Sequence, residues 1–143
     1  MSQYTASVPS GGQVRPEIQT FFEEFYKVTD TPDAHEQYVD MFTSDAKIIM
    51  GVNEYNGRNE IIQFRHGMWE KVASRSHNLI QLFAFSEGSN DLMAYGTVGF
   101  QFKDGRKGTA DWGARSHFTK ADGHLKMDFY QVYLDSAAMA RAK

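Results

Sequence analysis

The stretch that decides the fold is LMAYGTVGFQF at residues 92–102. Successive side chains of a strand point to opposite faces of a sheet, so the even-numbered residues share one face. That face is apolar and holds Ala94, Gly96, Val98, Phe100 and Phe102. The opposite face holds Tyr95, Thr97, Gly99 and Gln101. We therefore expect a strand whose even-numbered face turns towards the core.

The next stretch, GTADWGARSHFT at residues 108–119, follows a KDGRK turn and repeats this parity. Its expected inner face holds Ala110, Trp112, Ala114, Ser116 and Phe118. Its outer face holds Asp111, Arg115 and His117, which the parity removes from an inner pocket. This polar outer surface can be solvated or can pair with a second copy of the chain, and the sequence leaves both open.

Two flanking stretches, at residues 77–86 and 124–135, are also typical of strands. In the first, HNLIQLFAFS, periodicity does not choose between the odd face with His77 and Leu79 and the even face with Ile80 and Leu82. In the second, HLKMDFYQVYLD, two opposite faces are apolar. One holds Leu125, Met127 and Phe129, and the other holds Tyr130, Val132 and Leu134. A bulge near Phe129 would reconcile them.

Three helices are expected before these strands. Helical spacing of the apolar residues from Pro16 to Tyr26 predicts an amphipathic helix. TDTPD then breaks it, and a second short helix carries Tyr38, Met41 and Phe42. AKIIMGV at residues 46–52 predicts a buried strand. Asn56-Gly57 indicates the chain reversal, and a third helix starts near Arg58, with apolar residues as far as Val72.

Helices followed by hairpin-linked strands are typical of the α+β class. The length of 143 residues fits a single domain, which we place at residues 15–136. Residues 1–14 are polar and rich in Gly and Ser, which predicts a flexible N-terminal tail. Residues 137–143 are expected to form a C-terminal tail that either extends as a short helix or frays.

Composition excludes several functional classes. The formal charge is −3, with 15 basic and 18 acidic residues and no cluster of either sign, so neither nucleic acid nor an anionic membrane is an expected partner. The absence of cysteine excludes disulfides and thiolate chemistry. The histidines lack metal-ligand spacing and GxSxG is absent, so neither a metal nor a serine nucleophile is expected. Without a long apolar run or a signal pattern, we expect a cytoplasmic protein.

Four short phrases accompany this order of elements: FTSDAKIIM, YNGRNEI, KADGHL and QVYLD. Together they resemble the NTF2-like superfamily over residues 15–136, and within it the SnoaL-like cyclases and the fungal scytalone dehydratases, with the steroid delta-isomerases as more distant relatives. The resemblance implies a cone in which a strongly bent antiparallel sheet and three helices enclose an apolar pocket. It also implies enzymes that act without a cofactor on small metabolites.

The resemblance implies candidate catalytic residues. His77 falls where scytalone dehydratases carry a pocket histidine. Tyr26 falls close to the tyrosine that steroid isomerases use as an oxyanion donor, and Ser116 falls where those isomerases place a protonated aspartic acid. Asp30 can orient a histidine in the manner of the family's dyads.

Three positions depart from the family patterns. Met50 stands where the dehydratases carry a tyrosine and the isomerases a general-base aspartate. Phe102 and Ala114 stand at the positions of the second histidine and the asparagine of the dehydratases. These departures put both the dehydration of scytalone and steroid isomerisation in doubt.

Each catalytic candidate also has a plainer role. His77 can serve as a general acid or base, or it can be a structural histidine. Tyr26 can donate to an oxyanion, or it can pack in the core with its hydroxyl satisfied. Asp30 can orient a histidine, or it can accept backbone N–H groups in the TDTPD turn. The expected substrate-binding residues are Met50, Tyr55, Trp69, Phe100, Phe102, Trp112 and Ser116.

Two functional hypotheses follow. The first is a cofactor-independent lyase or isomerase, of dehydratase or cyclase type, that acts on a small hydrophobic or aromatic metabolite by general acid–base catalysis. The alternative is a non-catalytic NTF2-like protein that binds a small ligand or dimerises, which the three departures favour. In either case we expect a homodimer formed through the sheet face.

Overall fold

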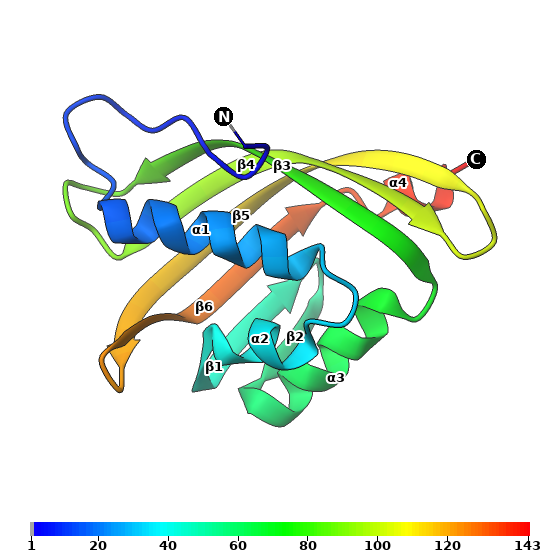
Figure 1. Cartoon of the computed structure of the whole chain (residues 1–143), viewed down its shortest axis with the longest axis horizontal. Coiled ribbons are helices and arrows are strands. Elements are labelled where there is room, and N and C mark those ends of the chain that lie inside the picture. The colour runs from blue at the N-terminus through cyan, green and yellow to red at the C-terminus, as the bar shows by residue number, and fades with distance from the viewer. Residues whose placement is uncertain (1) are drawn as a thin grey trace.

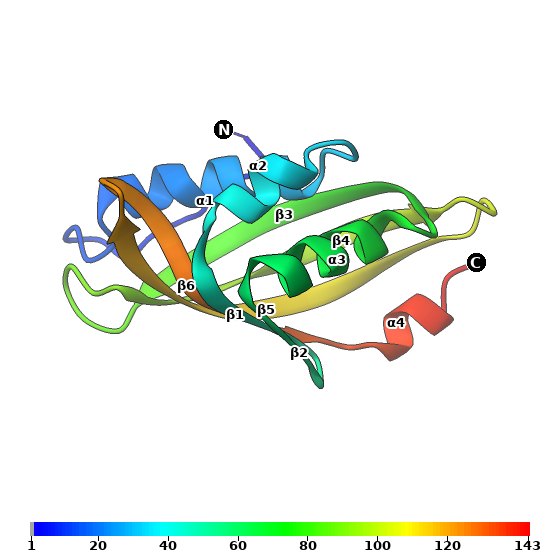
Figure 2. The same cartoon turned by 90° about the horizontal axis from the view of Figure 1, so that it is seen from below.

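The computed structural model describes residues 2–143. The elements in chain order are α1 (Pro16–Thr29), α2 (His35–Asp40), β1 (Phe42–Met50), β2 (Asn53–Asn56), α3 (Gly57–Trp69), β3 (Val72–Ala84), β4 (Asp91–Phe102), β5 (Lys107–Ala121), β6 (His124–Leu134) and α4 (Ala137–Ala140). The strands form one sheet in the order β2-β1-β6-β5-β4-β3. The sheet curves strongly without closing, and α1, α2 and α3 lie on its concave side (Figures 1 and 2).

This architecture confirms the α+β class and the bent sheet with three covering helices. The resemblance implied an antiparallel sheet, and the structure corrects this at one pair, because β1 runs parallel to β6. Strands joined by a tight hairpin must run antiparallel, as β3 to β6 do. No hairpin joins β1 to β6, since most of the chain lies between them, and their direction is therefore not constrained in this way.

Alternating burial along β4 and β5 confirms the predicted inner face. Ala94, Val98 and Phe100 are buried, whereas Met93 and Tyr95 on the same strand are exposed. On β5 the buried residues are Ala110, Trp112, Ala114, Ser116 and Phe118. Asp111 and Arg115 are exposed on the outer side, as predicted.

β-Bulges determine which side chains face inward on β3 and β6, the two strands for which periodicity did not choose a face. On β3 the register shifts between Leu79 and Gln81, so Leu79 is buried before the shift and Leu82 after it. His77 therefore shares the inward face of the first half of the strand. On β6, Met127 pairs with Phe118 while Phe129 pairs with His117, which confirms the bulge predicted near Phe129.

Three predicted boundaries are wrong. Phe42 begins β1 rather than ending the second helix, and Val72 begins β3 rather than ending the third. Both side chains are buried, so their apolar character did not distinguish a helix end from a strand start. The chain reversal predicted at Asn56-Gly57 occurs at Gly51, which has φ +61. Gly57 also has a positive φ, but it starts α3 directly after β2.

Both ends of the described range, residues 2–143, lie against the sheet. The segment expected to be a flexible tail runs beside the outer strand β3, where the Ser7 amide donates to the Ile80 carbonyl at 2.9 Å and the Leu79 amide donates to the Gln3 carbonyl at 2.9 Å. An edge strand offers such unpaired backbone groups whatever the sequence of its neighbour. At the other end, α4 is the short helix that the sequence left open, and Lys143 exchanges backbone hydrogen bonds with Lys107 on β5.

Aromatic packing fixes α1 over the sheet. Pro16 occupies the first turn, where its missing N–H leaves no bond unmade. The rings of Phe21 and Phe22 meet the ring of Phe118 at centroid distances of 5.0 and 5.4 Å, and further along the helix Phe25 meets Tyr130 at 5.2 Å. Each fully buried side chain of this kind stabilises the fold by about 1.5–3 kcal/mol. The C-terminal end of α1 is thereby held above the inner face, with Asp30 directly after it.

Candidate active site

Asp30 and His77 form a hydrogen-bonded pair on the inner side of the sheet. His77 Nδ1 lies 2.6 Å from Asp30 Oδ1, and the backbone N–H of His77 donates to Asp30 Oδ2 at 2.7 Å. The hydroxyl of Tyr4 donates to the same Oδ2 at 2.9 Å. The two side chains are only 13% and 6% exposed, His77 and Asp30 respectively. Since a carboxylate accepts hydrogen bonds, we assign the proton of the neutral imidazole to Nδ1, which leaves a lone pair on Nε2.

Arg65 of α3 holds the backbone that carries Asp30. Its side chain is fully buried, and its guanidinium donates to the carbonyl of Thr29 at 2.8 Å, to that of Val28 at 3.3 Å, and to that of Thr31. These carbonyls flank Asp30 on both sides, so one cation satisfies the end of α1 and the turn after it. Burial lowers the pKa of Arg65 to about 10, which still leaves it charged at neutral pH.

His77 lines a partly open cavity of about 220 Å³ between the sheet and the helices. The wall is mostly apolar and includes Phe25 of α1, Phe64 of α3, Phe100 of β4 and Val132 of β6. A dry cavity of roughly 150 Å³ is enough to hold benzene. This cavity therefore suits a hydrophobic ligand of one or two rings.

Four residues proposed from the sequence lie on this cavity wall: His77, Met50, Phe100 and Trp112. Asp30 does not line the cavity and acts on it through His77. Its partners are the imidazole and backbone of His77 and the Tyr4 hydroxyl, rather than amides of its own turn.

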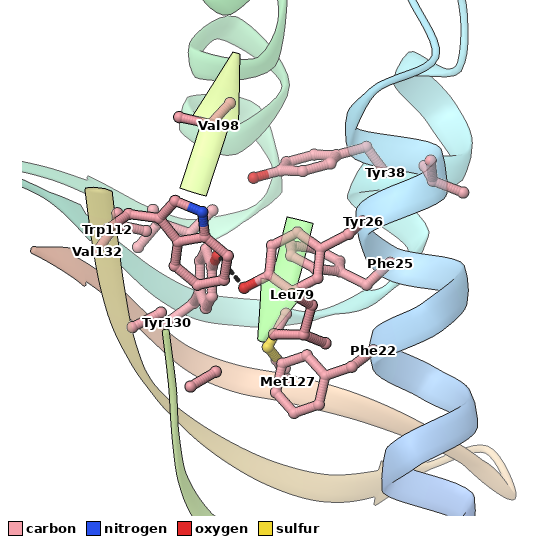
Figure 3. Packing of buried hydrophobic residues seen from close by; sticks show 14 of the residues in the cluster. Phe22, Phe25, Tyr26, Tyr38, Leu79, Val98, Trp112, Met127, Tyr130 and Val132 are labelled. Atoms are coloured by element: carbon pink, nitrogen blue, oxygen red, sulfur yellow. Dashed lines mark hydrogen bonds between the residues drawn. The ribbon is translucent and has the colours of Figure 1, made fainter. Parts of the chain in front are cut away.

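Tyr26 lies behind the wall, with its hydroxyl 2.9 Å from that of Tyr130 (Figure 3). Its ring centroid lies 5.2 Å from that of the His77 imidazole. The hydroxyl pair therefore joins α1 to β6, and only Tyr130 of the two reaches the cavity. Burial raises the pKa of both tyrosines, so both are neutral phenols at physiological pH.

The other four expected substrate-binding residues lie elsewhere. The ring of Tyr55 packs against that of Phe64 at a centroid distance of 4.5 Å, and Tyr55 is not among the residues that line the cavity. Trp69 is buried between two arginines, Phe102 packs against Phe100, and Ser116 is buried in the core. Inward parity selected Phe102 and Ser116 correctly as buried residues, but it did not say how far along the strand the cavity extends.

Arg75 lines the cavity from β3 and was not among the candidates predicted from the sequence. It lies two residues before His77, and strand periodicity places residues two apart on one face. That signal was present once β3 was known to begin before residue 75. Tyr4 and Arg65 gave no comparable signal, because their partners lie far away in the sequence.

Within residues 2–143, no group of three or more His, Cys, Asp or Glu side chains is arranged to hold a metal ion. None of the helices in the same part of the chain combines the length and apolar character needed to cross a membrane.

Comparisons with known proteins bear on the fold. No protein-family model and no curated protein sequence matches the chain. The structure of nuclear transport factor 2 from Cryptosporidium parvum is similar, with a TM-score of 0.68 and 11% identity over 90% of this chain and 100% of that one. The chain has the NTF2-like fold.

Two bacterial proteins with this fold are also similar, and both come from Novosphingobium aromaticivorans. A proposed aromatic ring hydroxylase matches with a TM-score of 0.75 and 21% identity over 82% of this chain and 86% of that one. A proposed scytalone dehydratase matches with a TM-score of 0.71 and 16% identity over 83% and 82% of the two chains. The TM-scores show the shared NTF2-like fold, whereas identities this low show nothing about the function of this chain.

Proposed function

We propose that this NTF2-like protein is a lyase or isomerase in which His77 removes a proton from a carbon next to a carbonyl group. The observation that carries the proposal is the Asp30–His77 pair, 2.6 Å apart, at the wall of a small apolar cavity. A histidine oriented by a buried carboxylate is an arrangement suited to a general base. The similarity to a proposed scytalone dehydratase supports the same class of reaction.

The two residues have distinct roles. Nε2 of His77 makes no hydrogen bond with residues 2–143, so its lone pair is free to take a proton from the ligand. Asp30 then stabilises the imidazolium through Nδ1–H while remaining a carboxylate itself. Proton removal leaves an enolate on the ligand, and His77 can return the proton to another atom.

The fate of that enolate distinguishes the reaction types. Returning the proton to a different carbon of the same ligand is an isomerisation. Expelling a β-hydroxyl, with the proton from His77 leaving on that oxygen as water, is a dehydration. Attack of the enolate carbon on a second carbonyl of the ligand, with that carbonyl oxygen taking the proton, is a cyclisation. All three begin with the same proton transfer and need no group beyond the ligand and the pair.

The cavity wall supports this chemistry by excluding water. Phe25, Phe100 and Trp112 surround the ligand space with apolar surface, so the charges that develop interact more strongly than they would in water. Tyr26 supports the site from behind, since its hydroxyl positions Tyr130 and its ring packs beside the imidazole.

Deuterium exchange tests the proposal without knowledge of the natural substrate. Wild-type protein is incubated in D₂O with small aromatic ketones such as 1-tetralone, and exchange next to the carbonyl is followed by mass spectrometry. We expect exchange well above the buffer rate, and a loss of about 10²- to 10⁴-fold in His77→Gln and Asp30→Asn.

The matched control is His117→Gln. His117 also pairs with a carboxylate, Asp128, at 2.7 Å, but on the outer face of the sheet and away from the cavity. Its substitution should leave exchange unchanged. Equal rates in wild type, His77→Gln and Asp30→Asn would contradict the mechanism. Binding of the ketones without any exchange by the wild type would favour the non-catalytic ligand-binding alternative.

A further inference from the structure

Arg75 places a positively charged group in the wall of the apolar cavity. One terminal nitrogen, Nη2, donates to the backbone carbonyl of Met68 at 3.1 Å, and the guanidinium lies 5.1 Å from the ring centroid of Trp69. The other terminal nitrogen, Nη1, is buried and has no hydrogen-bond partner within residues 2–143. No carboxylate in that part of the chain forms an ion pair with this arginine.

Comparison with Arg65 shows what is unusual about the hydrogen bonding of Arg75. Arg65 is fully buried and Arg75 is partly buried with its Nη1 inaccessible, but Arg65 directs its donors to backbone carbonyls and so has a structural explanation. A buried donor without an acceptor destabilises the fold, and more so when the group is charged. Burial lowers the pKa of Arg75, yet a guanidinium stays protonated at neutral pH. The unmade bond of Nη1 therefore indicates a place for an external acceptor.

A second unpaired donor belongs to Trp112, another residue of the cavity wall. Nε1 of Trp112 on β5 is buried and has no partner within residues 2–143. In Figure 3 this nitrogen and the hydroxyl of Tyr38 both point into the space between α1 and the strands. Nη1 of Arg75 and Nε1 of Trp112 are both donors on residues of the cavity wall, so a pure hydrocarbon would leave them unsatisfied. A ligand that supplies an acceptor, above all a negatively charged one, would satisfy them.

We propose that the ligand of this cavity carries an oxyanion, a carboxylate or a phenolate, on a hydrophobic skeleton of one or two rings, and that Arg75 binds this oxyanion with help from Trp112. The inference deepens the proposed function, because it concerns the same cavity, and it makes Arg75 the residue that selects and orients the substrate. A ring system held at one end by Arg75 would present its carbon framework to His77, two residues further along the same face of β3.

Calorimetric titration with three naphthalene probes tests whether the cavity prefers a ligand with an oxyanion. 2-Naphthoate supplies a carboxylate, 2-naphthol a phenol that can ionise on binding, and 2-naphthalenemethanol a neutral group of similar shape. A charged hydrogen bond in a buried site is worth about 1.5–3 kcal/mol, so we expect wild type to bind 2-naphthoate about 10- to 150-fold more tightly than the neutral alcohol. A phenolate absorption band in bound 2-naphthol would identify a phenolate as a second form that the site accepts.

The preference should depend chiefly on the charge of Arg75. Arg75→Met removes the charge at similar length and should bind the neutral alcohol as well as wild type does while losing the preference for 2-naphthoate. Arg115→Met is the matched control, since Arg115 lies 4.6 Å from the ring centroid of Phe129 on the outer face and should keep the full preference. Arg75→Lys keeps the charge and should retain part of the preference, which keeps the test informative where Arg75→Met does not fold.

Three results would overturn the proposal: equal affinities for 2-naphthoate and the alcohol in wild type, an undiminished preference in Arg75→Met, or no binding of any probe. His77→Gln separates this inference from the proposed function. A preference for 2-naphthoate that survives in His77→Gln, together with no ketone exchange by wild type, would leave the oxyanion site standing and remove the general base. Ketone exchange by wild type without a preference for 2-naphthoate would support the general base and remove the oxyanion site.

Discussion

Replacing Arg65 should destabilise the fold far more than replacing any exposed arginine of the same helix. Arg65→Met keeps much of the apolar length of the side chain but removes the guanidinium that donates to the carbonyls of Val28, Thr29 and Thr31. Its Nε also lies 3.2 Å from Nδ1 of His35, and its guanidinium lies 5.0 Å from the ring centroid of Tyr38. All of these interactions are lost together.

The magnitude follows from the acceptors left behind. A buried acceptor that loses its donor costs about 1–3 kcal/mol, but carbonyls can regain part of this from water at the turn after α1. Burying the Arg65 cation also costs free energy in the wild type. The variant avoids this cost, which offsets part of its loss of stability. We therefore expect a net loss of about 3–4 kcal/mol, which corresponds to a fall in Tm of roughly 6–16 °C for a domain of this size.

Thermal and urea unfolding, followed by circular dichroism, measure the loss. Arg58→Met is the control, because Arg58 also lies on α3 and forms two ion pairs at 2.9 Å, with Glu36 and Asp40, but all three side chains are exposed. Exposed pairs contribute about 0–1 kcal/mol each, so this variant should unfold close to wild type. Similar midpoints for the two variants would refute the claim that Arg65 organises the end of α1.

Three further outcomes are expected. Gly96→Ala should destabilise the protein by about 2–3 kcal/mol in urea unfolding, because its Cβ would lie 1.9 Å from a backbone carbonyl oxygen of β3, whereas Gly99→Ala on the same strand meets nothing within 4 Å and should be well tolerated. Tyr4→Phe should slow ketone exchange about 3- to 10-fold without weakening probe binding, because it removes one hydrogen bond that holds Asp30; an unchanged rate would assign Tyr4 to the fold alone. Tyr95→Arg should turn the expected homodimer into a monomer in sedimentation analysis, since Tyr95 is 41% exposed on the outer sheet face; a wild-type monomer would contradict the dimer itself.

Strand faces could be predicted from the sequence because alternation is a local property. Every second side chain is buried from Ala94 to Phe102 on β4 and from Ala110 to Phe118 on β5, as the alternation predicts. Where a bulge interrupts the alternation, as at Leu79, the rule gave two answers, and pairing with β4 decided between them. Element ends were less predictable, since Phe42 and Val72 are equally apolar at the end of a helix or the start of a strand.

The site was predictable only in part, because its bonds connect distant parts of the chain. His77 and Asp30 were both candidates, but 47 residues separate them, and no local pattern says that they meet. Arg75 carried a local signal, its spacing of two from His77, that became useful once the start of β3 was known. Tyr4 had none, since the segment that contains it is held to β3 by backbone groups that any sequence provides.

The parallel pairing of β1 with β6 has a consequence for the order of folding. Met50 pairs with Val132, so this contact spans most of the chain, whereas β3, β4 and β5 pair with their immediate successors. Contacts between distant residues close large loops and form late. During synthesis the hairpins can assemble while β6 is still missing, and β1 must wait for it. The cavity lined by His77, which has Met50 and Val132 in its wall, is therefore expected to be among the last parts of the molecule to be completed.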